Sequence, residues 1–160
     1  MAQVIITDQQ VISTAWATWG RTIIIGAATG IIFWLLTILL ARYVVEPLVC
    51  RQITDAAMCA NATPLAGNIA AVLAGAISII FMVRTGVARP IIIAVASAAL
   101  LWQLAAWTEG LFWIEALVWS ALLYAGAFAL FSWITRYAIL WVTVLLSVLI
   151  VLIIRIALIL

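Results

Sequence analysis

Long apolar runs separated by short polar breaks fill the chain from Arg21 to Leu160. A helix rises about 1.5 Å per residue, so about 20 apolar residues cross a hydrocarbon core of about 30 Å. Apolar residues make up 70% of the 160-residue chain and charged residues only 8%, whereas about a quarter of a soluble domain is charged. This composition excludes a soluble globular domain, a disordered chain and a nucleic-acid-binding protein.

The polar breaks divide the apolar region into five runs, which predict five transmembrane helices. The predicted spans cover residues 22–45, 65–83, 91–107, 111–135 and 138–160. The boundary near 135–138 is open, because residues 111–160 can also form one long bent helix. We therefore expect an all-α integral membrane protein in which residues 21–160 form one polytopic helical domain.

Residues 1–20 show a different pattern. Apolar side chains from Val11 to Trp19 recur on one stripe of a helix, and Thr7 or Asp8 can cap its N-terminus. This pattern predicts a short amphipathic helix that lies on the membrane surface and ends at Gly20.

The residue types present leave little room for catalysis. The chain has no histidine, which excludes a Ser–His or Cys–His nucleophile pair and a histidine-ligated metal. Its two thiols, Cys50 and Cys59, are separated by eight residues and do not form the C-x-x-C motif of thiol redox enzymes. We expect these cysteines to form a structural disulfide, with free thiols as the alternative. No enzymatic activity, cofactor or metal site is predicted.

Arginine placement predicts the orientation. Arg21, Arg84, Arg89 and Arg136 fall on one side of the predicted spans. The positive-inside rule then places the N-terminus in the cytoplasm and the loop of residues 50–59 on the outer side. A bacterial inner membrane is the expected location.

Four polar side chains are predicted at one depth in the outer layer of the membrane: Glu115, Arg155, Gln103 and Arg42. A charge in hydrocarbon costs several kcal/mol unless it is paired or hydrated. One interpretation is a Glu115–Arg155 salt bridge with Gln103 as a further hydrogen-bond partner. A second makes Glu115 the ion or proton ligand of a translocation site, and a third has both arginines extending to the headgroups.

Small residues indicate where helices approach each other closely. Gly26, Gly30, Gly75 and Gly126 each lie on a small-residue face of a predicted span. Such faces pack helices together in membranes. We expect packing within the chain, with an oligomer interface as the alternative.

The stretch from Cys50 to Trp107 resembles the two-helix hairpin of conjugative type IV secretion pilins. It has an outer cysteine-containing segment, a Pro64-x-x-Gly67 start, a small-residue helix and the basic turn from Arg84 to Arg89. The likeness covers about a third of the chain, and the additional predicted helices depart from the pilin pattern.

The favoured hypothesis is a non-enzymatic structural or assembly subunit of an oligomeric membrane complex, formed with its own copies or with other membrane subunits. The alternatives are a small ion or solute channel or transporter that acts through Glu115, and a pilin-like secretion component.

Overall fold

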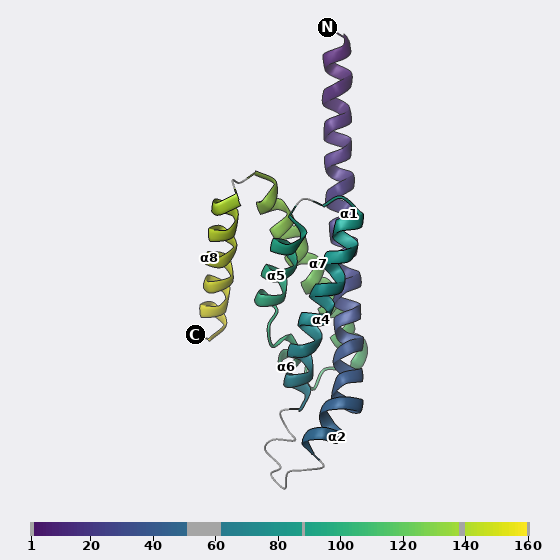
Figure 1. The fold of residues 1–160 in the computed structure, drawn as a ribbon, viewed down its shortest axis with the longest axis vertical. Coiled ribbons are helices and arrows are strands. Elements are labelled where there is room, and N and C mark those ends of the chain that lie inside the picture. Colours follow the sequence, from purple (N-terminus) through teal and green to yellow (C-terminus); the bar gives the residue numbers. More distant parts are fainter. Residues whose placement is uncertain (1, 51–61, 88, 138–139, 160) are drawn as a thin grey trace.

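The computed structural model describes residues 2–50, 62–87, 89–137 and 140–159, and every regular element in these ranges is a helix (Figure 1). In chain order the elements are α1 (Ala2–Leu40), the π-helical turn η1 (Ala41–Val45), α2 (Glu46–Val49), α4 (Ala62–Arg84), α5 (Pro90–Leu100), α6 (Leu104–Trp107), α7 (Trp113–Tyr137) and α8 (Leu140–Ile159).

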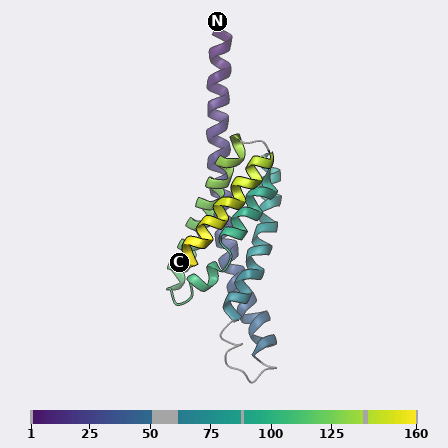
Figure 2. The ribbon, with the colours of Figure 1, turned by 90° about the vertical axis from the view of Figure 1, so that its left-hand side faces the viewer.

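The helices form an up-and-down bundle. α1 packs along α4 and α7, and α5 packs against α4 and α7. α8 lies at the edge, where it contacts α5 and α7 (Figures 1 and 2). The N-terminal half of α1 projects beyond the ends of the other helices (Figure 1). The outward side of α8 is apolar, with Trp141 79% and Leu145 67% exposed.

Three helices are long and apolar enough to cross a membrane: Trp19–Leu48, Ala62–Arg84 and Trp113–Thr135. They match the first, second and fourth predicted runs. α5 is shorter, with 11 residues, and the apolar part of α8 from Trp141 to Ile156 is also shorter than these three. The helical fold is thus that of a membrane-embedded protein, and the open boundary near residue 137 separates two helices that run in opposite directions (Figure 1).

Two predicted boundaries are wrong. The N-terminal helix does not end at Gly20, because α1 continues without a break to Leu40. A glycine inside a helix costs only about 1 kcal/mol relative to alanine, which is too little to end a helix by itself. The third run, 91–107, is not one helix, because a turn at residues 101–103 separates α5 from α6.

The core is formed by α1, α4, α5, α6 and α7, and two glycines of α1 permit its close approach to α7. A Cβ at Gly26 would lie 2.8 Å from the Phe128 Cβ, and one at Gly30 would overlap the Ser120 carbonyl oxygen. Gly75 packs at ordinary distance, because a Cβ there would lie 3.8 Å from the Ala98 Cβ. These three glycines therefore serve intrachain packing. Gly126 does not, because it is exposed and a Cβ there would meet no atom within 4 Å.

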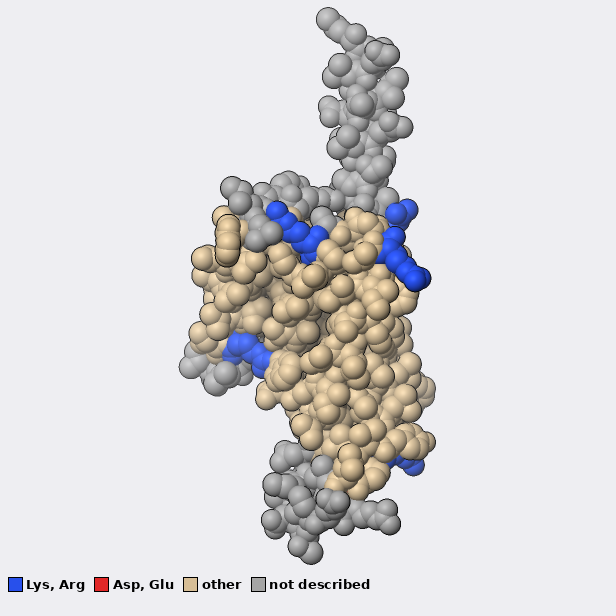
Figure 3. Space-filling model, viewed as in Figure 1, with Lys and Arg blue, Asp and Glu red and all other residues tan. Residues whose placement is uncertain are grey.

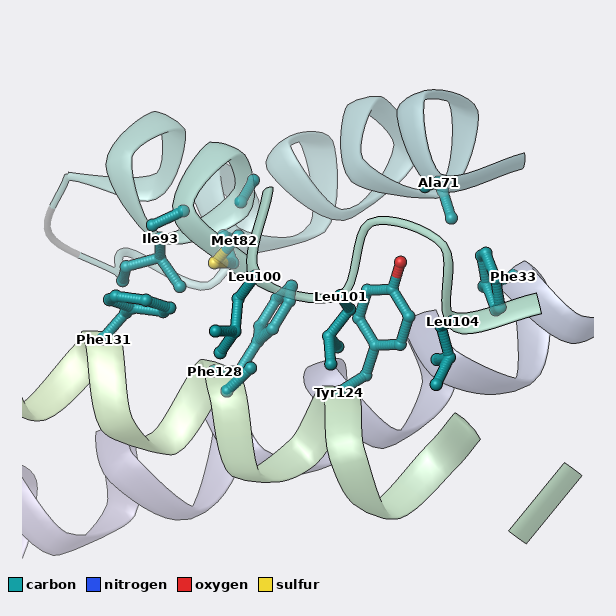
Figure 4. Packing of buried hydrophobic residues seen from close by; sticks show 14 of the residues in the cluster. Phe33, Ala71, Met82, Ile93, Leu100, Leu101, Leu104, Tyr124, Phe128 and Phe131 are labelled. Carbon is teal, nitrogen blue, oxygen red and sulfur yellow. The ribbon is translucent and has the colours of Figure 1, made fainter. Parts of the chain in front are cut away.

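Aromatic rings fill the space beside these glycines. Phe33 of α1 stacks at a tilt on Tyr124 of α7, with ring centroids 5.4 Å apart. Phe128 and Phe131 continue this layer along α7 toward Ile93 of α5 (Figure 4). The core thus fixes α7 against α1 on one side and against α5 on the other.

Candidate polar site at an interrupted helix

The interruption between α5 and α6 leaves backbone groups without helical partners. The Leu101 N–H still donates to the Ser97 carbonyl at 3.0 Å, but the Leu104 N–H donates to the Leu101 carbonyl at 3.0 Å in a tight turn. Gln103 has φ 70° and ψ 15°, in the left-handed region, which costs a non-glycine residue about 1–2 kcal/mol. The carbonyls at the end of α5 must therefore find partners outside their own helix.

Arg155 of α8 supplies those partners. Its guanidinium donates to the Trp102 carbonyl at 2.7 Å and to the Ala99 carbonyl at 3.3 Å. The negative end of a helix dipole and a cation attract each other, so the arginine compensates both the unpaired carbonyls and the dipole. Arg155 on α8 thus caps the C-terminal end of α5. The two carbonyls that it binds lie 56 and 53 residues earlier in the chain.

Helix lengths give the distances of the interruption and of Arg155 from the end of the bundle where α5 and α8 begin. The 11 residues of α5 rise about 16 Å. From Leu140 to Arg155, α8 rises about 22 Å. Both values fall inside a hydrocarbon core of about 30 Å. Non-helical backbone inside hydrocarbon is tolerated only where protein or water satisfies it, and Arg155 satisfies the carbonyls at this interruption.

The four residues predicted at one depth are not joined to each other. Glu115 is exposed in the first turn of α7, and Arg42 is exposed in η1. Gln103 is exposed at the interruption, next to Trp102, whose carbonyl Arg155 binds. Among the described residues no hydrogen bond or ion pair links Glu115 to Arg155. The structure therefore brings Arg155 together with the backbone beside Gln103 and leaves Glu115 and Arg42 elsewhere.

Two hydroxyls that the sequence places well inside apolar runs are buried near the interruption. Tyr124 is 1% exposed, and its ring points from α7 toward the segment between Leu101 and Leu104 (Figure 4). Ser97, on α5, is fully buried. Neither hydroxyl has a hydrogen-bond partner within the described part of the chain. The sequence signal for both residues is a hydroxyl inside an otherwise apolar run.

Other buried hydroxyls are satisfied by their own helices. Ser78 donates to the Gly75 carbonyl at 2.7 Å, and Ser120 donates to the Ala116 carbonyl at 2.7 Å. Thr37 donates to the Phe33 carbonyl at 2.8 Å. Hydroxyls that bond within their own helix do not line a continuous polar path.

A separate cavity of about 210 Å³ lies between α1 and the start of α7. Its lining is mainly apolar and aromatic and includes Trp34 and Trp113, whose ring centroids are 6.4 Å apart. Glu109 is the one acidic residue that lines it. Within residues 2–50, 62–87, 89–137 and 140–159, no cluster of acidic residues or cysteines is arranged to hold a metal ion.

Three of the four arginines that predict the orientation lie close to the ends of the three long apolar helices, and the fourth, Arg89, precedes α5. Arg21 and Arg84 are exposed, and Arg89 is half-buried and donates to the Thr143 hydroxyl at 2.9 Å. Arg136 lies in the last turn of α7. Cys50 is half-buried at the end of α2 and is not a free thiol. Cys59 lies outside the described residues, so its pairing with Cys50 stays a prediction.

Comparison of the chain with known protein families, characterised proteins and solved structures finds no match.

Proposed function

We propose that the protein is a non-enzymatic structural or assembly subunit of an oligomeric membrane complex. The observation that carries this proposal is the engagement of Arg155 with the Ala99 and Trp102 carbonyls. One of the four polar residues predicted at one depth thus serves helix closure, and no described carboxylate binds it. A residue used in this way stabilises a fold and contributes nothing to a translocation pathway.

The proposal includes five helical segments in the bilayer. Three are the long apolar helices of α1, α4 and α7, the fourth is the interrupted pair α5 and α6, and the fifth is α8. The fifth segment supports a partner-bound or lipid-bound role, because one whole side of α8 is apolar and uncovered by this chain. Lipid and neighbouring copies or other membrane subunits are the partners we infer.

We infer that the N-terminus is cytoplasmic and that Cys50 lies on the outer side of a bacterial inner membrane. The described acids Glu46, Glu109 and Glu115 lie at the end opposite Arg84 and Arg89. Arginine atoms gather where α1 projects from the bundle (Figure 3). Such an excess of arginine is typical of cytoplasmic ends.

Glu115 gives the channel hypothesis little support. Its side chain is exposed at the start of α7, and the described hydroxyls deeper in the bundle bond mostly to their own helices. The pilin likeness is also weakened, because the second helix of the proposed hairpin is interrupted after Leu100.

The decisive experiment measures the mass of the protein after extraction from its native membrane in a mild detergent. A complex containing several copies or additional membrane chains supports the proposal. A matched preparation cross-linked before extraction controls for dissociation by detergent. A monomer in both preparations contradicts the subunit role.

A further inference from the structure

An apolar groove of about 330 Å³ runs between α5 and α8. Its walls include Ile92 and Val95 from α5 and Val148 and Val151 from α8. This volume falls at the lower end of the range for sites that bind small organic molecules, about 300–1,000 Å³. The groove is therefore large enough for part of a lipid chain.

Arg89 lies beside the end of the groove that begins at Ile91 and Val144. Arg89 precedes α5 and donates to the hydroxyl of Thr143 on α8 at 2.9 Å, so its guanidinium bridges the two helices that form the groove. No side chain caps the N-terminus of α5, where Pro90 occupies the first turn. Backbone N–H groups and the helix dipole favour an anion at such a position. Arginine atoms also gather at this end of the bundle (Figure 3).

A buried hydroxyl lies inside the same groove. Ser147 lines the groove one helical turn, about 6 Å, below Thr143. It is 4% exposed, and its hydroxyl has no hydrogen-bond partner among the described residues. Ser78 and Ser120, in contrast, bond to carbonyls of their own helices. A buried hydroxyl without a partner is costly, so a polar ligand atom that packs against Ser147 would gain a hydrogen bond there.

We propose that this groove binds an anionic phospholipid. The phosphate lies at Arg89 and the N-terminus of α5, an ester carbonyl accepts a hydrogen bond from Ser147, and one acyl chain follows Val95 and Val151. The order of groups along the groove, from cation to hydroxyl to apolar walls, matches the order of phosphate, ester and acyl chain in a phospholipid. A zwitterionic lipid fits less well, because its ammonium group would lie near the Arg89 guanidinium.

The test is native mass spectrometry of the full chain extracted from vesicles that contain equal amounts of phosphatidylglycerol and phosphatidylcholine. We expect the wild-type protein to retain phosphatidylglycerol preferentially. Removing a charge-assisted contact in R89Q should lower that retention about tenfold. R84Q, which removes an exposed arginine at the end of α4, is the matched control and should change retention less than about twofold.

Two further variants keep the test independent of the fold of R89Q. S147L fills the groove while Arg89 stays in place, and it should lose bound phosphatidylglycerol with unchanged helical circular dichroism. S147A, which removes only the hydroxyl, should lower retention less than S147L does. Equal retention of the two lipids by the wild type overturns the proposal, as does retention by S147L at the wild-type level. Displacement of the lipid by millimolar inorganic phosphate overturns it as well, because that result assigns a free-phosphate site.

Discussion

Replacing Arg155 tests whether its hydrogen bonds to the Ala99 and Trp102 carbonyls hold α8 against the rest of the bundle. The R155L variant removes both hydrogen bonds and leaves the Trp102 and Ala99 carbonyls without donors. A hydrogen bond to a charged group contributes about 1.5–3 kcal/mol, and the bond at 3.3 Å contributes less than the one at 2.7 Å. Relief of the desolvation of the half-buried arginine offsets part of this loss. We expect the free energy of unfolding to fall by about 2 kcal/mol.

The assay is thermal unfolding in a mild detergent, followed by circular dichroism and by protease resistance. For a chain of this size, about 2 kcal/mol corresponds to a decrease of about 4–8 °C in Tm. R42Q is the matched control, because Arg42 is an exposed arginine in η1, and its Tm should stay within about 2 °C of the wild type. R155K, which keeps the charge on a shorter donor, should fall between R155L and the wild type.

A double-mutant cycle with E115Q separates carbonyl capping from the alternative salt bridge. Capping predicts that E115Q alone is nearly neutral and that its coupling to R155L is below about 0.5 kcal/mol. A salt bridge predicts that E115Q is as destabilising as R155L and that the double variant adds little. A large coupling, or an R155L protein as stable as the wild type, refutes the capping interpretation.

Three further predictions concern packing, a buried hydroxyl and topology. G30A should destabilise the protein by about 1–3 kcal/mol, because the new Cβ meets the Ser120 carbonyl. G126A is the control and should be neutral or slightly stabilising in the same denaturation assay. Equal effects of the two variants would contradict the α1–α7 contact. Y124F should leave Tm unchanged or raised, since the lost hydroxyl is buried without a partner in the described structure; a clear decrease would reveal a bound water or ligand. Cys50 should react with a membrane-impermeant maleimide only after reduction and only from the outer side, and reaction from the cytoplasmic side alone would reverse the orientation.

The long helices were predictable because length and apolarity alone decide them. The runs at 22–45, 65–83 and 111–135 need no information about neighbours to be helical in a membrane, since backbone groups there must be paired within the segment. Gly26 and Gly30 were also predictable as packing residues, because glycine four residues apart in an apolar run permits close helix approach. Gly126 shows the limit of that rule, because a Cβ there would meet no atom of the described residues within 4 Å.

The interruption after α5 was not predictable from local sequence. Residues 99–105 contain neither glycine nor proline, and leucine, alanine and glutamine all favour helix. What permits the break is Arg155, which lies on a helix more than 50 residues further along the chain. The same long-range dependence explains why the sequence predicts a Glu115–Arg155 salt bridge: the two residues share a predicted depth, and the carbonyl partners of Arg155 are not visible in the sequence. A carbonyl acceptor leaves no signature in a sequence, since every residue has one.

The interruption after α5 and Arg155 satisfy each other's hydrogen bonds: the guanidinium supplies donors, and the carbonyls at the end of α5 supply acceptors. An arginine in the outer part of a membrane helix requires acceptors, and a helix that ends inside the bilayer requires donors. Arg155 meets both needs at one end of α8, and the Arg89–Thr143 hydrogen bond joins α5 to α8 near the other end. Between these two polar contacts the helices leave an apolar groove. α8 is therefore fixed to the bundle at two polar points, and the space between them can be filled by lipid without loss of either contact.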